Sequence, residues 1–137
     1  MNPRTRTALL RSLVPVAVMA TIFYFSAQPG VDHHGWFAVV LRKLGHVTGY
    51  ALLTAAWWWT LRIVIRRRPL PWAVGIAFAY ACTDEFHQTL VRGRDGSVRD
   101  VAIDAIGMAI AAYAISRWAP RRRRTPSPRS SPVSSPS

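Results

Sequence analysis

Four long apolar segments are the feature that most limits how this chain can fold. They are residues 9–28, 44–65, 70–91 and 98–118. Each is close to the roughly 20 residues that a helix needs to cross the hydrocarbon core of a membrane. A soluble four-helix bundle would show a polar face on every turn, and these segments lack one. The sequence therefore predicts an all-α protein built as a bundle of four transmembrane helices.

The first segment has an alternative interpretation as a signal peptide, because Arg4, Arg6 and Arg11 precede its apolar run. That run is long, however, and Ser-Ala-Gln at residues 26–28 makes only a weak cleavage site. We therefore interpret the segment as a membrane span that stays in the protein.

The basic residues predict which way the helices cross the membrane. If the N-terminus is cytoplasmic, thirteen of the eighteen basic residues lie on the cytoplasmic side and five on the outer side. Cytoplasmic loops of membrane proteins carry such an excess of Lys and Arg. We therefore expect a multi-pass protein of the cytoplasmic membrane with both termini in the cytoplasm and with the acidic residues on or near the outer face.

The last part of the chain, residues 120–137, differs in composition from the rest. It consists mainly of Arg, Pro and Ser, with almost nothing to bury. We expect a disordered cytoplasmic tail here, after a membrane domain of residues 1–119. The arginine run 121–124 directly follows the last apolar segment, so we interpret it as a topology signal that attracts anionic lipid and not as a nucleic-acid site.

The carboxylates are concentrated in one part of the sequence. Five of the six, Asp84, Glu85, Asp95, Asp100 and Asp104, lie within 21 residues at the ends of apolar helices, although the net charge is +12. Carboxylates at such positions cost free energy that partners or a function must offset. This region is therefore where we expect the functional site.

Polar stripes at helical spacing accompany these carboxylates. Arg42, His46 and Tyr50 recur every four residues beside Lys43, so we expect them on one face where the second helix opens, near Arg42. Asp84 and Gln88 share a face of the third helix, with Glu85 beside them. Ser97 is a plausible N-cap for the fourth helix, and Asp100 and Asp104 share one face of it. The paired His33 and His34 point apart on a helix, so we interpret them as solvated loop residues.

We expect these side chains to meet in one outward-opening polar cup, because each lies on an outer helix end or in the loop before it. The predicted members are Arg42, Lys43, His46, Tyr50, Asp84, Glu85, Gln88, Arg94, Asp100 and Asp104. His46 is the candidate acid or base, since it titrates near neutral pH. Asp84 and Glu85 would orient it or hold a divalent ion. The others would bind substrate, with Asp100 and Asp104 positioning the arginines. The alternative is a structural network of ion pairs that pins the helix ends.

At these residues the chain resembles the VanZ-like family of small bacterial membrane proteins. The matching blocks span most of residues 24–112 in order, and two of them depart slightly from the family pattern, at Arg92 and Asp104. The blocks are Ser-Ala-Gln-Pro-Gly at 26–30, Lys43 with His46 and Tyr50, Asp84-Glu85 with Gln88, Gly93-Arg94, Asp100, and Asp104 with Gly107. The resemblance implies a polytopic protein of the cell envelope. The founding member of the family is associated with low-level resistance to the glycopeptide teicoplanin.

Two kinds of function fit these observations. In the first, the cup binds or acts on an anionic envelope molecule, such as a lipid-linked phosphate or a cell-wall precursor. In the second, a non-catalytic module binds a glycopeptide, a precursor or a partner protein. A transporter ranks third, because four short helices without a broken pair leave little room for alternating access unless the protein forms a homo-oligomer. The sequence names no cofactor, and it leaves open whether the protein is an enzyme.

Overall fold

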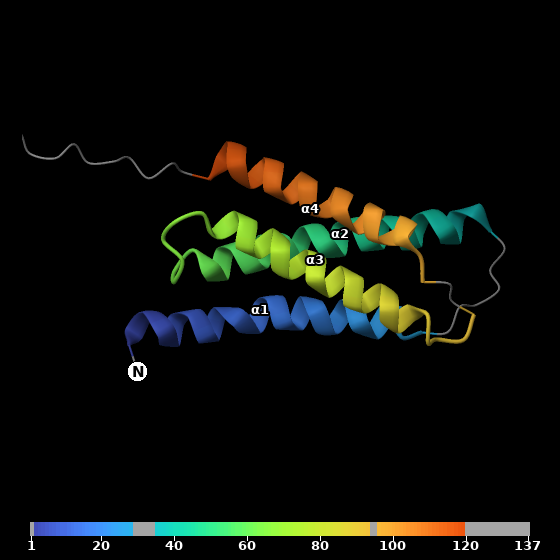
Figure 1. Ribbon diagram of the computed structural model, residues 1–137, viewed down its shortest axis with the longest axis horizontal. Coiled ribbons are helices and arrows are strands. Elements are labelled where there is room, and N and C mark those ends of the chain that lie inside the picture. The colour runs from blue at the N-terminus through green and yellow to red at the C-terminus, as the bar shows by residue number, and fades with distance from the viewer. Residues whose placement is uncertain (1, 29–34, 94–95, 120–137) are drawn as a thin grey trace, which may run out of the picture.

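The structure, a computed structural model, describes residues 2–28, 35–93 and 96–119, and these residues form four helices without a strand (Figure 1). Helix α1 spans Pro3–Ser26, α2 spans Trp36–Leu61, α3 spans Pro69–Gln88 and α4 spans Val98–Trp118. The prediction of an all-α, four-helix chain is confirmed. The expected tail at 120–137 and the pair His33 and His34 lie outside the described residues.

The helix ends follow local capping rules. Asn2 caps α1 by accepting a hydrogen bond from the Arg4 N–H at 3.1 Å, and Pro3 occupies the first turn, where its missing N–H is tolerated. Ser97 caps α4 as predicted, by accepting from the Arg99 N–H at 3.0 Å.

The start of the second helix was predicted wrongly. Helix α2 begins at Trp36 and not near Arg42, because residues 36–41 are apolar and contain no proline or glycine that would delay the helix. Arg42 and Lys43 therefore lie in the second turn of α2 and not at its first residues.

The helices run alternately up and down (Figure 1), so that the start of α1 and the end of α4 lie at the same end of the bundle. Helix α2 packs against all three other helices, and within the described ranges α1 and α4 do not contact each other. The end of α1, the start of α2, the end of α3 and the start of α4 consequently gather at the opposite end, as the predicted cup requires.

Small residues allow the central helices to approach closely. Ala73, Ala77 and Ala81 recur every four residues on α3 and are fully buried, two of them in a core with Tyr50 and Leu53 of α2. A Cβ added to Gly107 of α4 would collide with the backbone of Val47 in α2. Interfaces between helices in membranes are enriched in such small residues, because they permit close packing of the backbones.

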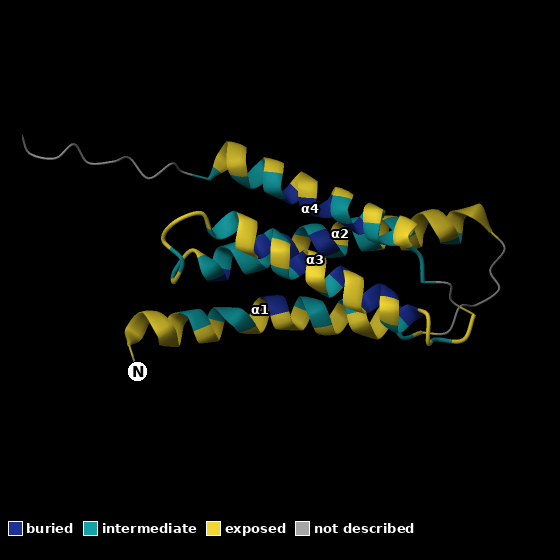
Figure 2. Cartoon of the chain, viewed as in Figure 1, coloured by how far each residue is buried: buried dark blue, intermediate teal, exposed yellow. Residues whose placement is uncertain are grey.

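The exterior of the bundle is apolar, whereas several charged residues are inside. Leu13, Leu52, Trp72 and Ile110 are each more than half exposed, and Figure 2 shows exposed positions along all four helices. Asp84, Glu85, Gln88 and Asp104 are at most 5% exposed. A soluble monomer rarely leaves so much of its large apolar side-chain surface in water.

By length and composition alone, only α1 among the helices of the described residues is clearly able to cross a membrane. The other three helices carry the polar residues of the site, which lower their mean hydropathy. The prediction of four membrane spans is therefore supported for α1, and for α2, α3 and α4 it stays a prediction.

Candidate functional site

Two contacts one turn apart join α2 to α4. The Lys43 Nζ lies 3.0 Å from Asp100 Oδ1, and the His46 Nδ1 lies 3.0 Å from Asp104 Oδ1. Spacings of three residues on α2 and four on α4 place both pairs on facing surfaces. Gly107, about one turn beyond Asp104 on α4, closely approaches Val47, the residue after His46 on α2, and this contact fixes the register in which the pairs meet.

His46 and Asp104 form the deeper pair. Asp104 is completely buried, and the His46 side chain is 17% exposed. The His46 ring also stacks on Tyr50, with ring centroids 6.3 Å apart. Asp104 Oδ2 and the Tyr50 hydroxyl are buried without a hydrogen-bond partner in the part of the chain that the structure describes. A buried carboxylate that holds one ring nitrogen orients the imidazole and favours proton transfer at the other.

A second polar cluster joins α1 to α3. The Ser26 hydroxyl donates to Asp84 Oδ2 at 2.8 Å, and the Gln88 amide donates to the same oxygen at 3.1 Å. All three residues are at most 5% exposed. Asp84 Oδ1 has no hydrogen-bond partner among the described residues. Among the residues that the structure describes, Ser26 and Gln88 thus satisfy one oxygen of this carboxylate and leave the other without a partner.

Glu85 lies between the two groups. Its Oε1 accepts from the Gln88 amide at 3.3 Å, and its Oε2 accepts from the backbone N–H of Ser97 at 2.9 Å. A side chain on Gly96 would collide with the Glu85 carbonyl, so this glycine lets the start of α4 approach the end of α3. Within the described residues no lysine or arginine lies in ion-pair range of Asp84, Glu85 or Asp104.

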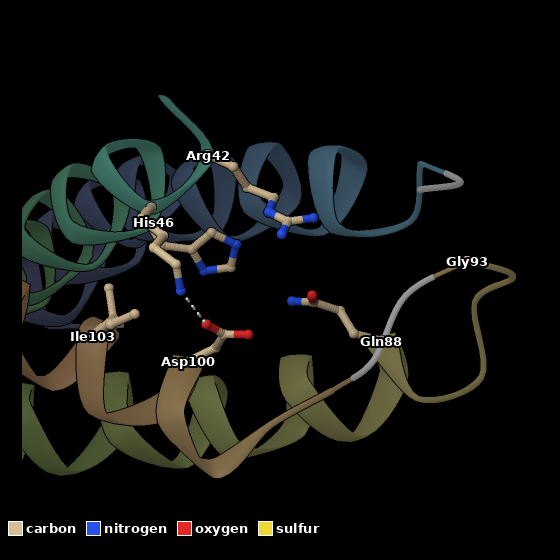
Figure 3. Close-up of a pocket in the computed structure, with 7 residues that line it drawn as sticks. Arg42, His46, Gln88, Gly93, Asp100 and Ile103 are labelled. Carbon is tan, nitrogen blue, oxygen red and sulfur yellow. Dashed lines mark hydrogen bonds and ion pairs between the residues drawn. The ribbon is translucent and has the colours of Figure 1, made fainter. Parts of the chain in front are cut away.

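A cavity of about 150 Å³ opens above these groups (Figure 3). Arg42 and His46 of α2 extend toward it from one side and Gln88 of α3 from the other. The remaining lining residues are Lys43, Gly93, Asp100 and Ile103. Arg42 makes no ion pair in the described part of the chain. The cavity therefore presents to a ligand a guanidinium without an ion pair among the described residues, an imidazole and an amide. This arrangement suits an anionic group.

The sequence profile of the VanZ/LLP1 family matches residues 4–119, which include all four helices and the cavity. The chain belongs to the VanZ/LLP1 family. No curated protein matches it, and no solved structure does. The matched range ends where the Arg, Pro and Ser segment begins.

The fold of this VanZ/LLP1 protein brings most predicted site residues together. Nine of the ten belong to described residues at the same end of the bundle; the tenth, Arg94, lies outside them. Tyr50 contributes to the core and not to the lining of the cavity. His87 packs on Phe23, with ring centroids 4.7 Å apart, and stays outside the cavity.

The pairing of these residues in the VanZ/LLP1 chain differs from the predicted roles. Asp104 is the carboxylate that hydrogen-bonds His46, whereas Asp84 bonds Ser26 and Gln88. Asp100 pairs with Lys43 and not with an arginine. Ser26 was missed as a site residue, because a serine shortly before a Pro-Gly sequence indicates only that the helix ends there. Its signal was a small hydroxyl side chain as the last residue of an otherwise apolar helix.

Proposed function

We propose that this VanZ/LLP1 protein is a multi-pass protein of the cytoplasmic membrane whose polar cup binds the anionic headgroup of an envelope molecule on the extracytoplasmic face. A lipid-linked phosphate or a cell-wall precursor has the required chemistry. The observation that carries the proposal is the cavity that Arg42, Lys43, His46 and Gln88 line at the acidic end of an otherwise apolar bundle. A headgroup would enter this cavity while its lipid tail stays on the apolar exterior.

The membrane placement rests on where the apolar and charged side chains lie. Exposed leucines, valines and aromatic residues cover α1 and continue along the other three helices. Of the basic residues that the structure describes, eight lie at one end of the bundle and four at the other. The eight are Arg4, Arg6, Arg11, Arg62, Arg66, Arg67, Arg68 and Arg117, and the four, which share their end with all the described acidic residues, are Arg42, Lys43, Arg92 and Arg99. The positive-inside rule assigns the basic end to the cytoplasm.

The chemistry of the cup allows more than binding. The His46–Asp104 pair has the arrangement of a general base held by a carboxylate, and His46 lines the cavity. A bound phosphate ester or precursor would place its anionic group near Arg42 and within reach of the imidazole. We therefore assign Arg42 to binding and His46 to any proton transfer that accompanies it.

Cysteine labelling tests the proposed orientation. In a Cys82→Ala background, Val98→Cys should react with a membrane-impermeant maleimide in intact cells, and Val64→Cys should react only after lysis. Both valines are exposed, and they lie at opposite ends of the bundle. The reverse pattern would contradict the cytoplasmic placement of the basic end.

A binding measurement tests the proposed ligand class. Full-length protein in detergent should bind a polyprenyl phosphate at least about tenfold more tightly than the uncharged polyprenol, because a hydrogen bond to a charged group contributes about 1.5–3 kcal/mol. Arg42→Gln should remove most of this preference. Arg99→Gln is the matched control, since this arginine is exposed at the same end but does not line the cavity. Equal affinity for the two lipids, or equal effects of the two variants, would refute the proposal.

Binding of a cell-wall precursor at this site would also connect the protein with glycopeptide susceptibility. VanZ, after which the family is named, is associated with low-level teicoplanin resistance, and a protein that holds a cell-wall precursor would change how much of it the drug can reach. This link would appear as a shift in teicoplanin susceptibility when the gene is deleted and restored.

A further inference from the structure

The polar cup contains a second kind of candidate site, below the cavity. One donor atom each from His46 of α2, Glu85 of α3 and Asp104 of α4 lie within 4.8 Å of one another. Three different helices therefore deliver one nitrogen and two carboxylate oxygens to a single point.

The hydrogen-bonding of Asp104 is independent evidence for a ligand at this point. Asp104 is 0% exposed, and its Oδ2 has no hydrogen-bond partner in the described residues. A buried oxygen of a carboxylate without a partner costs free energy, so native proteins rarely leave one. Glu85 and Asp84 are also buried, and the described residues supply no lysine or arginine to these three carboxylates. A cation in the cluster would satisfy the bare oxygen and offset the charge.

The donor set and the distances indicate which cations fit. Imidazole favours transition metals and carboxylates favour harder ions, so a mixed set suits first-row divalent metals such as Zn²⁺ or Mn²⁺ better than Mg²⁺. Donors about 2.1 Å from a tetrahedral zinc ion lie roughly 3.4 Å apart. The three donor atoms lie within 4.8 Å of one another, so closing around a zinc ion requires the widest pair to approach by up to about 1.4 Å.

We propose that His46, Glu85 and Asp104 bind one divalent transition-metal ion at the base of the cup. This site goes beyond the proposed function and does not depend on it, because the ion is measured without any lipid. When an ion is bound, His46 serves as a ligand, and water or an anionic headgroup in the cavity above can complete the coordination.

Metal analysis of the full-length protein in detergent tests the proposal. His33→Gln and His34→Gln are introduced first, so that this adjacent pair cannot bind metal adventitiously. After treatment with a chelator and dialysis against Zn²⁺ or Mn²⁺, the protein should hold one ion per chain and melt at a higher temperature than the metal-free form. Asp104→Asn and His46→Gln should each weaken binding about 100-fold, whereas His87→Gln should not.

A second measurement avoids variants that fail to fold. Co²⁺ bound to the unaltered site should give d–d absorption typical of nitrogen and oxygen ligands, and added Zn²⁺ should displace it. Less than one ion per chain, or binding that Asp104→Asn and His46→Gln leave unchanged, would overturn the proposal. Headgroup binding by Arg42 could still be correct in that case, so the two proposals fail separately.

Discussion

Gly107→Ala is expected to separate α2 from α4 and to destabilise the protein strongly. The new Cβ would meet the Val47 carbonyl and backbone, which cannot move aside as a flexible side chain can. Overpacking of this kind costs about 1–3 kcal/mol, which corresponds to a melting temperature lower by roughly 4–12 °C. Thermal unfolding of the purified protein in detergent measures the change.

Gly75→Ala is the matched control. This glycine is also within a helix, but a Cβ there meets nothing within 4 Å. Alanine stabilises a helix interior by about 0.5–1 kcal/mol relative to glycine, so the melting temperature should stay the same or rise. If Gly107→Ala behaved like Gly75→Ala, the close contact that sets the register of the His46–Asp104 pair would be refuted.

Asp84→Asn is expected to raise stability by about 1–2 kcal/mol while it impairs function. The amide oxygen can still accept from Ser26 and Gln88, and the substitution removes a buried charge that no lysine or arginine in the described residues compensates. Such a gain would show that the carboxylate is kept for a reason other than stability. The measurement is again the melting temperature, now together with membrane yield.

Asp100→Asn provides the comparison for that experiment. Its carboxylate is partly exposed and paired with Lys43, so its loss should change stability by less than about 1 kcal/mol. If the acidic end of the bundle were only a structural brace, Asp84→Asn would instead lower the melting temperature by more than Asp100→Asn does.

The sequence predicted the helices and the end of the bundle at which polar residues gather. The lengths of the apolar segments predicted four helices. Because consecutive helices run in opposite directions, the polar helix ends were expected to meet at one end of the bundle. The four-residue spacing of Asp100 and Asp104 correctly placed both on one face of α4, and the structure shows that this face points toward α2. These features follow from helical periodicity within each segment, which a single sequence displays directly.

The partners within the site could not be predicted in the same way. Whether His46 meets Asp84 of α3 or Asp104 of α4 depends on how α2 packs against these two helices. The contact of Gly107 with Val47 brings α2 and α4 together in the register that pairs His46 with Asp104. The start of α2 at Trp36 was also missed, since an apolar run next to a glycine suits a loop near the membrane as well as a helix. Interhelical register and helix boundaries both depend on tertiary packing.

The most direct test distinguishes a cup that binds or acts on an envelope molecule from a polar network that only holds the helix ends together. Cells that lack the gene should regain their normal profile of lipid-linked precursors when the unaltered protein is restored. His46→Gln keeps hydrogen-bonding capacity, and Asp104→Asn keeps the size of the side chain. Both should leave the protein folded in the membrane yet fail to restore the profile. Normal profiles from both variants, at unaltered protein level and melting temperature, would contradict the account and make the polar cluster a structural brace.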